Sequence, residues 1–181
     1  KSGLNYSIVL PAEKIRTFAR SEYLTQIDFS LATGHLMSDT MLINNNVIGI
    51  HNATLPLSQK YDGDGIILGI IDSGIDFSHP DFKDSSGYTR ILSIWDQNLS
   101  TNSNTPVRYG YGQAFDSAQI NSNNCPHDDP ANHFGHGSMV AGAAASNGLA
   151  TGNYRGVAPK ANLVVVASNF GSSNFLASIA D

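Results

Sequence analysis

Residues 66–76 read IILGIIDSGID, and this run decides the fold. Its first six residues are apolar without alternation, as expected for a strand that is covered on both faces of a parallel sheet. Residues 161–167, ANLVVVA, form a second run of the same kind. Asp72 directly follows the first run, and in open parallel sheets functional groups gather beyond the carboxyl ends of the strands. The pattern therefore predicts a parallel sheet with Asp72 at this edge.

A segment of very small residues between the two strands favours a helix. Residues 137–146, GSMVAGAAAS, permit very close packing, and Asn147-Gly148 is a good C-terminal stop. Residues 91–95, ILSIW, predict a further strand. Because buried strands alternate with helices, we expect an α/β fold with a doubly wound, mostly parallel sheet.

His136 begins the small-residue helix, in the run GHGSMVAG of residues 135–142. An Asp and a His from separate elements are two of the three members of an acyl-transfer triad. Histidine suits proton transfer because its unperturbed pKa lies near neutrality. Taken singly, Asp72 could instead be a turn residue before Gly74, and His136 a loop residue at a helix start.

Three segments together resemble the subtilisin-like serine peptidases, the subtilase family. They are DSGIDFSHPD at 72–81, GHGSMVAG at 135–142 and GVAP at 156–159. The second departs from the usual family pattern at Ser138, which keeps the hydroxyl of a Thr, and at Met139, which replaces a His. The resemblance implies that Asp72 accepts the Nδ1 proton of His136 and that His136 is the general base, so the two should lie within hydrogen-bond reach.

The family's nucleophile, in a Gly–Thr–Ser segment, and its oxyanion-hole Asn have no counterpart up to Asp181. We therefore expect residues 61–181 to be the N-terminal part of a subtilisin-like peptidase domain. The rest of the domain would be covalently attached or a second chain, and this chain alone would be inactive. The alternative is a catalytically inactive pseudoprotease or a truncated binding protein.

Residues 1–60 predict a separate small α+β unit. A strand at 6–10 and a helix from Pro11 to about Arg20 precede an alternating strand at 23–31. This strand–helix–strand order resembles part of the pro-segment that precedes many subtilisin-like domains, or it is an unrelated N-terminal domain. Asp62-Gly63-Asp64-Gly65 marks the boundary.

The long spacing between Asp72 and His136 reflects an insertion from about Lys83 to Ala131. Its segments RILSIWDQ at 90–97 and GYGQ at 110–113 resemble a bacterial branch of the family. The tyrosines and asparagines of the insertion could form a rim of the substrate cleft or cover the edge of the sheet.

The resemblance also implies further contacts. Asp81 aligns with a family calcium ligand, and carboxylates suit calcium, but the partner loop is not recognisable and the alternative is a cap after Pro80. Phe175 and Ser172 fall where the family binds extended peptide substrates, or Phe175 is plain core. No cofactor is required, and calcium is possible.

Two other site classes are weighed and discounted. Zinc could draw on a cluster of His, Cys and Asp, but its spacings match no closed zinc pattern; the cluster comprises Cys125, His127, Asp128, Asp129, His133 and His136. Gly135-x-Gly137 superficially resembles a dinucleotide fingerprint, yet that motif must directly follow a strand, and here it follows a polar segment.

The composition argues against some classes of binding partner. Fifteen acidic and ten basic residues give a formal net charge of −5, with no basic run, which argues against nucleic acid and anionic membranes. No apolar run is long enough to span a membrane. The single Cys125 excludes an intrachain disulfide. No signal peptide is recognisable, but the sequence begins at Lys1 without a Met, so an upstream segment could have been removed. By resemblance we expect a secreted or cell-envelope bacterial protein that acts on peptides or proteins.

Overall fold

The structure is a computed structural model that describes residues 11–20, 38–129 and 135–170. The chain divides into two compact units, residues 1–35 and 36–181, which are described separately. The strands predicted at 6–10 and 23–31 lie outside the described residues, as do His133, Ser172 and Phe175. The predicted domain boundary between residues 60 and 61 stays a prediction.

The first unit contains helix α1, Ala12–Phe18. Pro11 precedes the first turn with φ −59°, a value already close to that of a helix, and its missing N–H costs nothing there. Glu13 lies in the first turn and Arg16 in the last, so both charges favour the helix dipole. The helix predicted from Pro11 is confirmed, and it ends two residues before Arg20.

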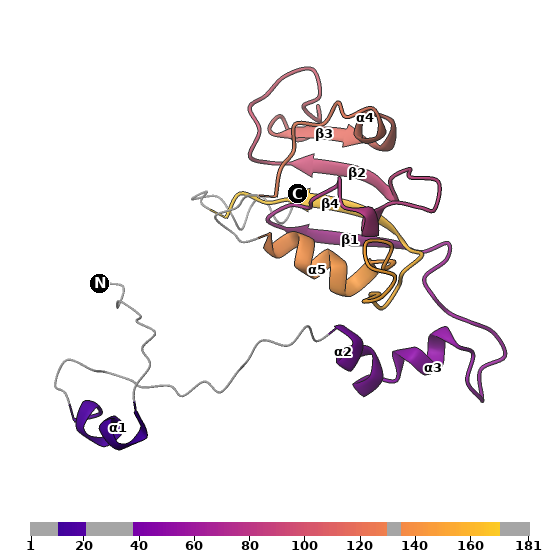
Figure 1. The fold of residues 1–181 in the computed structure, drawn as a ribbon. Coiled ribbons are helices and arrows are strands. Elements are labelled where there is room, and N and C mark those ends of the chain that lie inside the picture. The colour runs from indigo at the N-terminus through magenta and orange to yellow at the C-terminus, as the bar shows by residue number, and fades with distance from the viewer. Residues whose placement is uncertain (1–10, 21–37, 130–134, 171–181) are drawn as a thin grey trace. The chain divides into compact units, whose positions relative to one another are not determined.

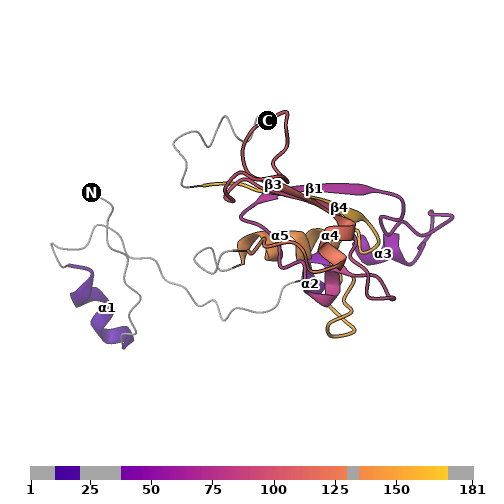
Figure 2. The ribbon, with the colours of Figure 1, turned by 90° about the horizontal axis from the view of Figure 1, so that it is seen from above.

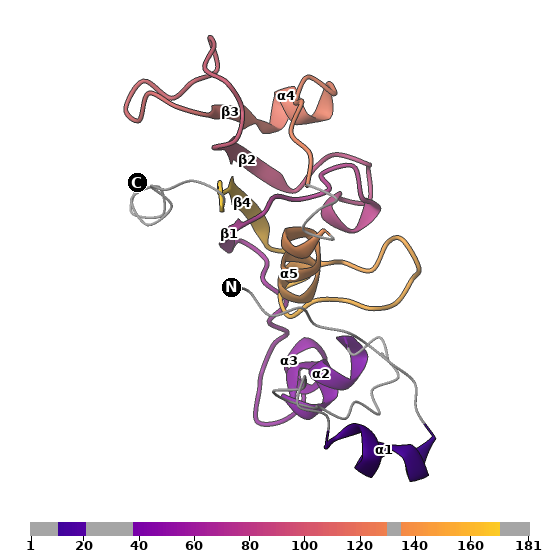
Figure 3. The ribbon, with the colours of Figure 1, turned by 90° about the vertical axis from the view of Figure 1, so that its left-hand side faces the viewer.

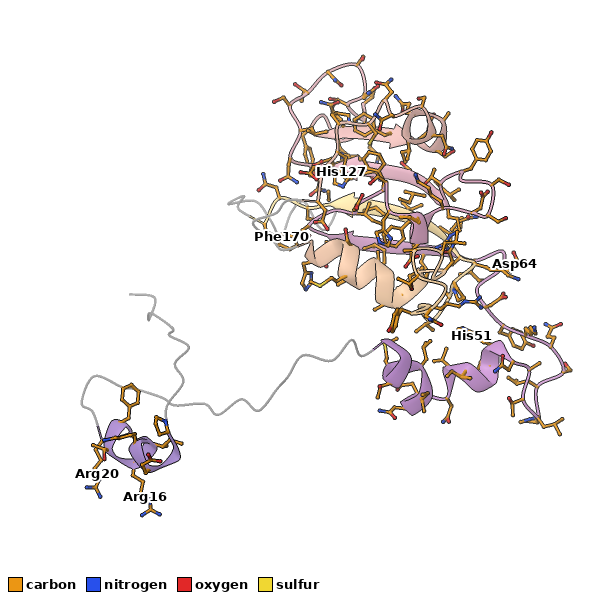
Figure 4. All side chains as sticks on the ribbon, in the orientation of Figure 1. Arg16, Arg20, His51, Asp64, His127 and Phe170 are labelled. Carbon is orange, nitrogen blue, oxygen red and sulfur yellow. The ribbon has the colours of Figure 1, made fainter. Side chains whose placement is uncertain are left out.

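The second unit opens with two short helices, α2 (Ser38–Asn44) and α3 (Val47–His51). Asn46, with φ 56°, takes the left-handed conformation that separates them. At the end of α3, the ring of His51, labelled in Figure 4, forms a hydrogen bond of 2.7 Å with the carbonyl of Val157. This contact ties α3 to the loop that leads into the last strand.

Four strands form one sheet in the order β1-β4-β2-β3 (Figure 1). Strand β4 pairs in parallel with both β1 and β2, whereas β2 and β3 are antiparallel. The strands are β1 (Ile67–Asp72), β2 (Ile91–Asp96), β3 (Gln113–Asp116) and β4 (Asn162–Ala167). The strands predicted from residues 66–71, 91–95 and 161–167 are confirmed, and the sheet is mixed but mostly parallel.

The helices beside the sheet are α4 (Ser117–Asn121) and α5 (His136–Ala145). Both lie on the same side of the sheet, as the two perpendicular views show (Figures 2 and 3). A doubly wound sheet has helices on both faces. The doubly wound arrangement therefore stays a prediction. Within the described residues, no helix is both long and apolar enough to cross a membrane.

The core lies between the sheet and α5. The fully buried side chains of β2 and β4 include Ile94, Leu163 and Val165, and Ala141 and Ala145 of α5 pack against the same cluster. Alanines and glycines allow this helix to approach the sheet closely, as predicted from its composition. This close approach brings the first turn of α5 to the carboxyl end of β1.

The opposite face of β1 is open among the described residues. Ile67 and Ile71, which point to that face, are 59% and 54% exposed. Over β2 the same alternation leaves Trp95 half-buried, and the insertion covers it. The Trp95 ring stacks on Tyr109 with centroids 4.6 Å apart, and Tyr111 lies 5.2 Å away. These two tyrosines therefore cover the sheet.

Buried Arg90, from the RILSIWDQ segment, joins three elements of this unit. Its guanidinium donates hydrogen bonds to the carbonyls of Asp81, Ala145 and Ala161 at 2.6, 2.6 and 2.5 Å. These acceptors belong to the η1 turn (Pro80–Phe82), the end of α5 and the residue directly before β4. The arginine of that segment is thus structural, because its guanidinium supplies donors to the carbonyls of three separate segments.

Candidate active site

Asp72 is the last residue of β1 and lies at the carboxyl end of the parallel strands. The chain turns sharply at Gly74, whose φ of 148° favours glycine. A Cβ at Gly74 would lie only 2.6 Å from Cε1 of His127. The turn that follows Asp72 therefore needs a glycine for space as well as for conformation.

His136 is the first residue of α5, and its Nδ1 lies 2.8 Å from Oδ1 of Asp72. Gly135 precedes it in the left-handed conformation, with φ 65°. The carboxylate side chain is only 12% exposed, whereas the imidazole is 61% exposed. The predicted contact, with the carboxylate facing Nδ1, is confirmed by this geometry.

The hydrogen-bond partners of Asp72 define its ionisation state. Burial raises the pKa of Asp72, but the hydrogen bonds from His136 and from the Ser73 N–H at 2.7 Å outweigh it, so the pKa lies below its usual value. The group is therefore an ionised carboxylate at neutral pH and can only accept hydrogen bonds.

That ionisation assigns the tautomer of His136. Because the carboxylate accepts, Nδ1 must carry the hydrogen, and in a neutral ring Nε2 then carries the lone pair. The ring is mostly exposed, so a nucleophile delivered from outside these residues can reach it. The pair can hold one proton acceptor in a fixed orientation, which is the requirement for general-base catalysis.

A second layer of polar contacts joins the two loops that carry Asp72 and His136. Ser73 Oγ donates to Asp129 Oδ1 at 2.8 Å and accepts the Gly137 N–H at 2.9 Å. Asp129 Oδ2 accepts from both the N–H and the Oγ of Ser138, at 2.9 and 2.6 Å. The Ser138 hydroxyl, which takes the place of the Thr hydroxyl of the usual family pattern, therefore forms a hydrogen bond in this layer. The role of Asp129 was missed, because its partners are distant along the chain.

A second Asp–His pair lies in the core, and the sequence analysis did not predict it. His127 Nδ1 is 2.6 Å from Asp96 Oδ2, and both side chains are almost fully buried. His127 Nε2 accepts the N–H of Ile75 at 3.0 Å. Burial raises the pKa of Asp96, but its hydrogen bonds with His127 and Asn98 lower this pKa by more. The pKa of Asp96 therefore lies below its usual value.

These contacts bear on the metal alternatives. Both ring nitrogens of His127 have protein partners, so this residue is not free to bind zinc. Among the described residues, no three His, Cys, Asp or Glu side chains are grouped to hold a metal. Asp81 lies in the η1 turn, where its Oδ1 accepts the Ala150 N–H at 2.8 Å. One carboxylate oxygen thus has a structural partner, and calcium at Asp81 stays a prediction.

Comparisons with known proteins found similar sequences. The family model described as the subtilase family, peptidase S8, matches residues 63–180. The minor extracellular protease Vpr of Bacillus subtilis (strain 168) is 32% identical over 104 residues, covering 58% of this chain and 10% of that protein. The PI-type proteinase of Lactococcus lactis subsp. cremoris is 30% identical over 142 residues, covering 68% of this chain and 7% of that protein.

A solved structure is also similar. The CspB protease of Clostridium perfringens is 31% identical, with a TM-score of 0.47, and the match covers 62% of this chain and 23% of that one. The chain spans a tenth or less of the length of the two curated proteases above.

Proposed function

The chain belongs to the subtilase family, and we propose that it supplies the Asp and His of the Asp–His–Ser triad of a subtilisin-type serine endopeptidase. The observation that supports this proposal most directly is the 2.8 Å contact between Asp72 Oδ1 and His136 Nδ1. It lies at the carboxyl end of the parallel pair β1 and β4, inside the segment that matches the family. The serine nucleophile and the oxyanion-hole donors would come from the rest of the peptidase domain, covalently attached or as a second chain.

In this mechanism the pair moves one proton twice. Nε2 of His136 takes the hydroxyl proton of the serine as the serine oxygen attacks the scissile carbonyl. The resulting imidazolium is stabilised by the Asp72 carboxylate, and it then gives the proton to the leaving amine as the acyl-enzyme forms. A water molecule attacks the acyl-enzyme with the same assistance. Asp72 remains ionised throughout, which agrees with the downward shift of its pKa.

The proposal extends to substrate and location. The substrate is a peptide or protein, and Ser172 and Phe175 would contact its extended chain. Calcium would bind at Asp81 as a structural ion. One relative is named an extracellular protease, which supports a secreted or cell-envelope protein here as well.

The test compares variants of the complete protein that contains this chain. We expect His136→Ala and Asp72→Asn to lower kcat/KM for peptide cleavage by about 10⁴-fold or more, because triad members act as a unit. Met139→Ala is the matched control, because this exposed side chain lies on the same helix and is not part of the pair. It should leave kcat/KM within about twofold.

Two results would contradict the proposal. Peptide cleavage that survives His136→Ala would place the chemistry elsewhere. A wild-type protein that is folded and binds peptides but never cleaves them would favour the pseudoprotease alternative. Asp72→Asn is informative on its own, because asparagine keeps the shape of the side chain but offers His136 the wrong hydrogen-bonding groups.

A further inference from the structure

We propose that His127 and Asp129 are positioning residues that hold the Asp72 turn against the start of α5. Both belong to one segment of the insertion, residues 125–129. Their side chains form hydrogen bonds with residues that flank Asp72 and His136 in the sequence. The catalytic consequence rests on the proposed function, whereas the positioning itself does not. We call residues 125–129 the strut segment.

Asp129 connects the two loops through three hydrogen bonds. Its Oδ1 accepts from Ser73, the residue after Asp72, and its Oδ2 accepts twice from Ser138, two residues after His136. Ser73 Oγ in turn accepts the Gly137 N–H at 2.9 Å, which makes the hydroxyl a bridge between the loops. Ser138 Oγ also accepts the Asp76 N–H at 2.7 Å. Ser73 and Ser138 are thus each hydrogen-bonded to Asp129 and to a backbone N–H on the other loop.

His127 supports the same turn from the core. Its Nε2 accepts the Ile75 N–H, three residues after Asp72, while Nδ1 is held by Asp96 at 2.6 Å. Because the carboxylate fixes the hydrogen on Nδ1, Nε2 is the acceptor that a backbone N–H requires. Asp96 belongs to β2, so this contact ties the turn to the centre of the sheet (Figure 4 labels His127).

Steric contacts make the arrangement stiff. A Cβ at Gly74 would overlap the His127 ring, and a Cβ at Gly137 would overlap the Gly74 carbonyl oxygen. The Gly74 backbone is therefore packed closely between the His127 ring and the Gly137 backbone. This close packing, together with the hydrogen bonds above, leaves the turn little room between His127 and the helix that carries His136.

The required precision explains why such support matters. A misplacement of about 1 Å in a reacting group can cost about 100-fold in rate. Asp72 and His136 come from different elements 64 residues apart, so their distance depends on how firmly the two loops are joined. The strut segment contributes four side-chain hydrogen bonds to that junction, one from His127 and three from Asp129.

The decisive variant is Asp129→Asn, compared with Asp128→Asn. Both remove one negative charge from adjacent residues, but Asp128 is exposed and Asp129 is half-buried in the junction. Asparagine at 129 has one acceptor oxygen where the structure uses two, so its NH₂ group would face a donor. We expect Asp129→Asn in the complete peptidase to lower kcat by about 10- to 100-fold with KM within about threefold. Asp128→Asn should resemble the wild type.

His127→Gln tests the core contact in the same way. It should also lower kcat with little change in KM, and its thermal unfolding profile shows whether the protein remains folded. If this buried variant does not fold, the half-buried Asp129→Asn still carries the test. Equal losses in Asp128→Asn and Asp129→Asn would overturn the proposal in favour of a simple charge effect, and so would kcat within twofold of the wild type in Asp129→Asn.

A measurement without activity separates this proposal from the proposed function. The ¹⁵N NMR shifts of the His136 ring report whether Nδ1 carries the hydrogen that Asp72 accepts. We expect one tautomer in the wild type and in Asp128→Asn, and a mixture in Asp129→Asn. If the wild type cleaves no peptide, the proposed function fails while this comparison still decides the positioning. A single unchanged tautomer in Asp129→Asn would contradict the positioning role.

Discussion

At the residue scale, the Asp72–His136 and Asp96–His127 pairs differ mainly in exposure. The ring of His136 is 61% exposed and that of His127 is fully buried, although both are held through Nδ1 by a carboxylate. Asp72 and Asp96 also occupy the same row of the sheet, because both pair with Ala167 in register. Only the exposed pair can pass a proton to a substrate. The buried pair instead has both ring nitrogens used by the protein.

The buried pair predicts how stability depends on pH. The pKa of Asp96 is lowered in the folded state, so its ionised form stabilises the fold above the ordinary carboxyl pKa of about 4, and this contribution is lost as the pH falls through the folded-state value. We expect the free energy of unfolding to fall as the pH drops below about 5. Asp96→Asn should be less stable than the wild type at pH 7, and the difference should shrink in acid.

Urea denaturation at a series of pH values checks this prediction. Asp128→Asn serves as the control, because it removes an exposed carboxylate of the strut segment. A difference between wild type and Asp96→Asn that widens as the pH falls would contradict the assigned ionisation of Asp96.

The residues that could be predicted from sequence are those with a local signature. Asp72 follows an apolar run and His136 begins a run of small residues, so each is recognisable from its immediate neighbours. Asp129 and His127 carry no such signature. Their partners Ser73 and Ile75 lie 56 and 52 residues away, and only the folded chain brings them together.

At the element scale, α5 has two glycines with different roles. A Cβ at Gly137 would overlap the Gly74 carbonyl oxygen, whereas a Cβ at Gly142 would meet nothing within 4 Å. Both are helical, so the comparison isolates the effect of space from that of backbone conformation.

This difference predicts opposite effects of the same substitution. Gly142→Ala should stabilise the protein by about 0.5–1 kcal/mol, because alanine restricts the unfolded chain and favours the helix. Gly137→Ala should destabilise it by about 1–3 kcal/mol and separate Asp72 from His136. Chemical denaturation of the two variants measures both effects. Equal stability of the two variants would show that α5 does not pack on the turn as closely as described.

The elements that sequence missed are short. Strand β3 has four residues, QAFD, and helices α2 and α3 have seven and five. Segments of this length contain too few positions for a period of two or 3.6 residues to be distinguished. Strands β1 and β4 have only six residues each, and they were predictable from their dense runs of apolar residues rather than from their length.

At the scale of the whole molecule, the face of β1 that points away from α5 remains apolar and open within the described residues. Ile67 and Ile71 are more than half exposed on β1, although strands of parallel sheets are normally covered on both faces. Under the proposed function, the rest of the peptidase domain packs on this face.

This exposed face predicts the behaviour of residues 1–181 produced alone. We expect the polypeptide to self-associate, because apolar faces of this kind favour association. The double variant Ile67→Thr/Ile71→Thr should reduce that association, and light scattering at several concentrations measures it. The double variant Ile43→Thr/Leu55→Thr is the control, because it removes exposed apolar side chains elsewhere. A monodisperse wild-type monomer would show that this face needs no cover.

The central claim is that Asp72 and His136 activate a serine supplied by the rest of the domain. The rate at which a serine-directed covalent inhibitor labels the complete protein tests it most directly, because labelling requires an activated hydroxyl. We predict that a single serine outside residues 1–181 is labelled, and that His136→Ala slows labelling by at least about 1,000-fold. Labelling of a serine within residues 1–181, or labelling at an unchanged rate in His136→Ala, would contradict the claim.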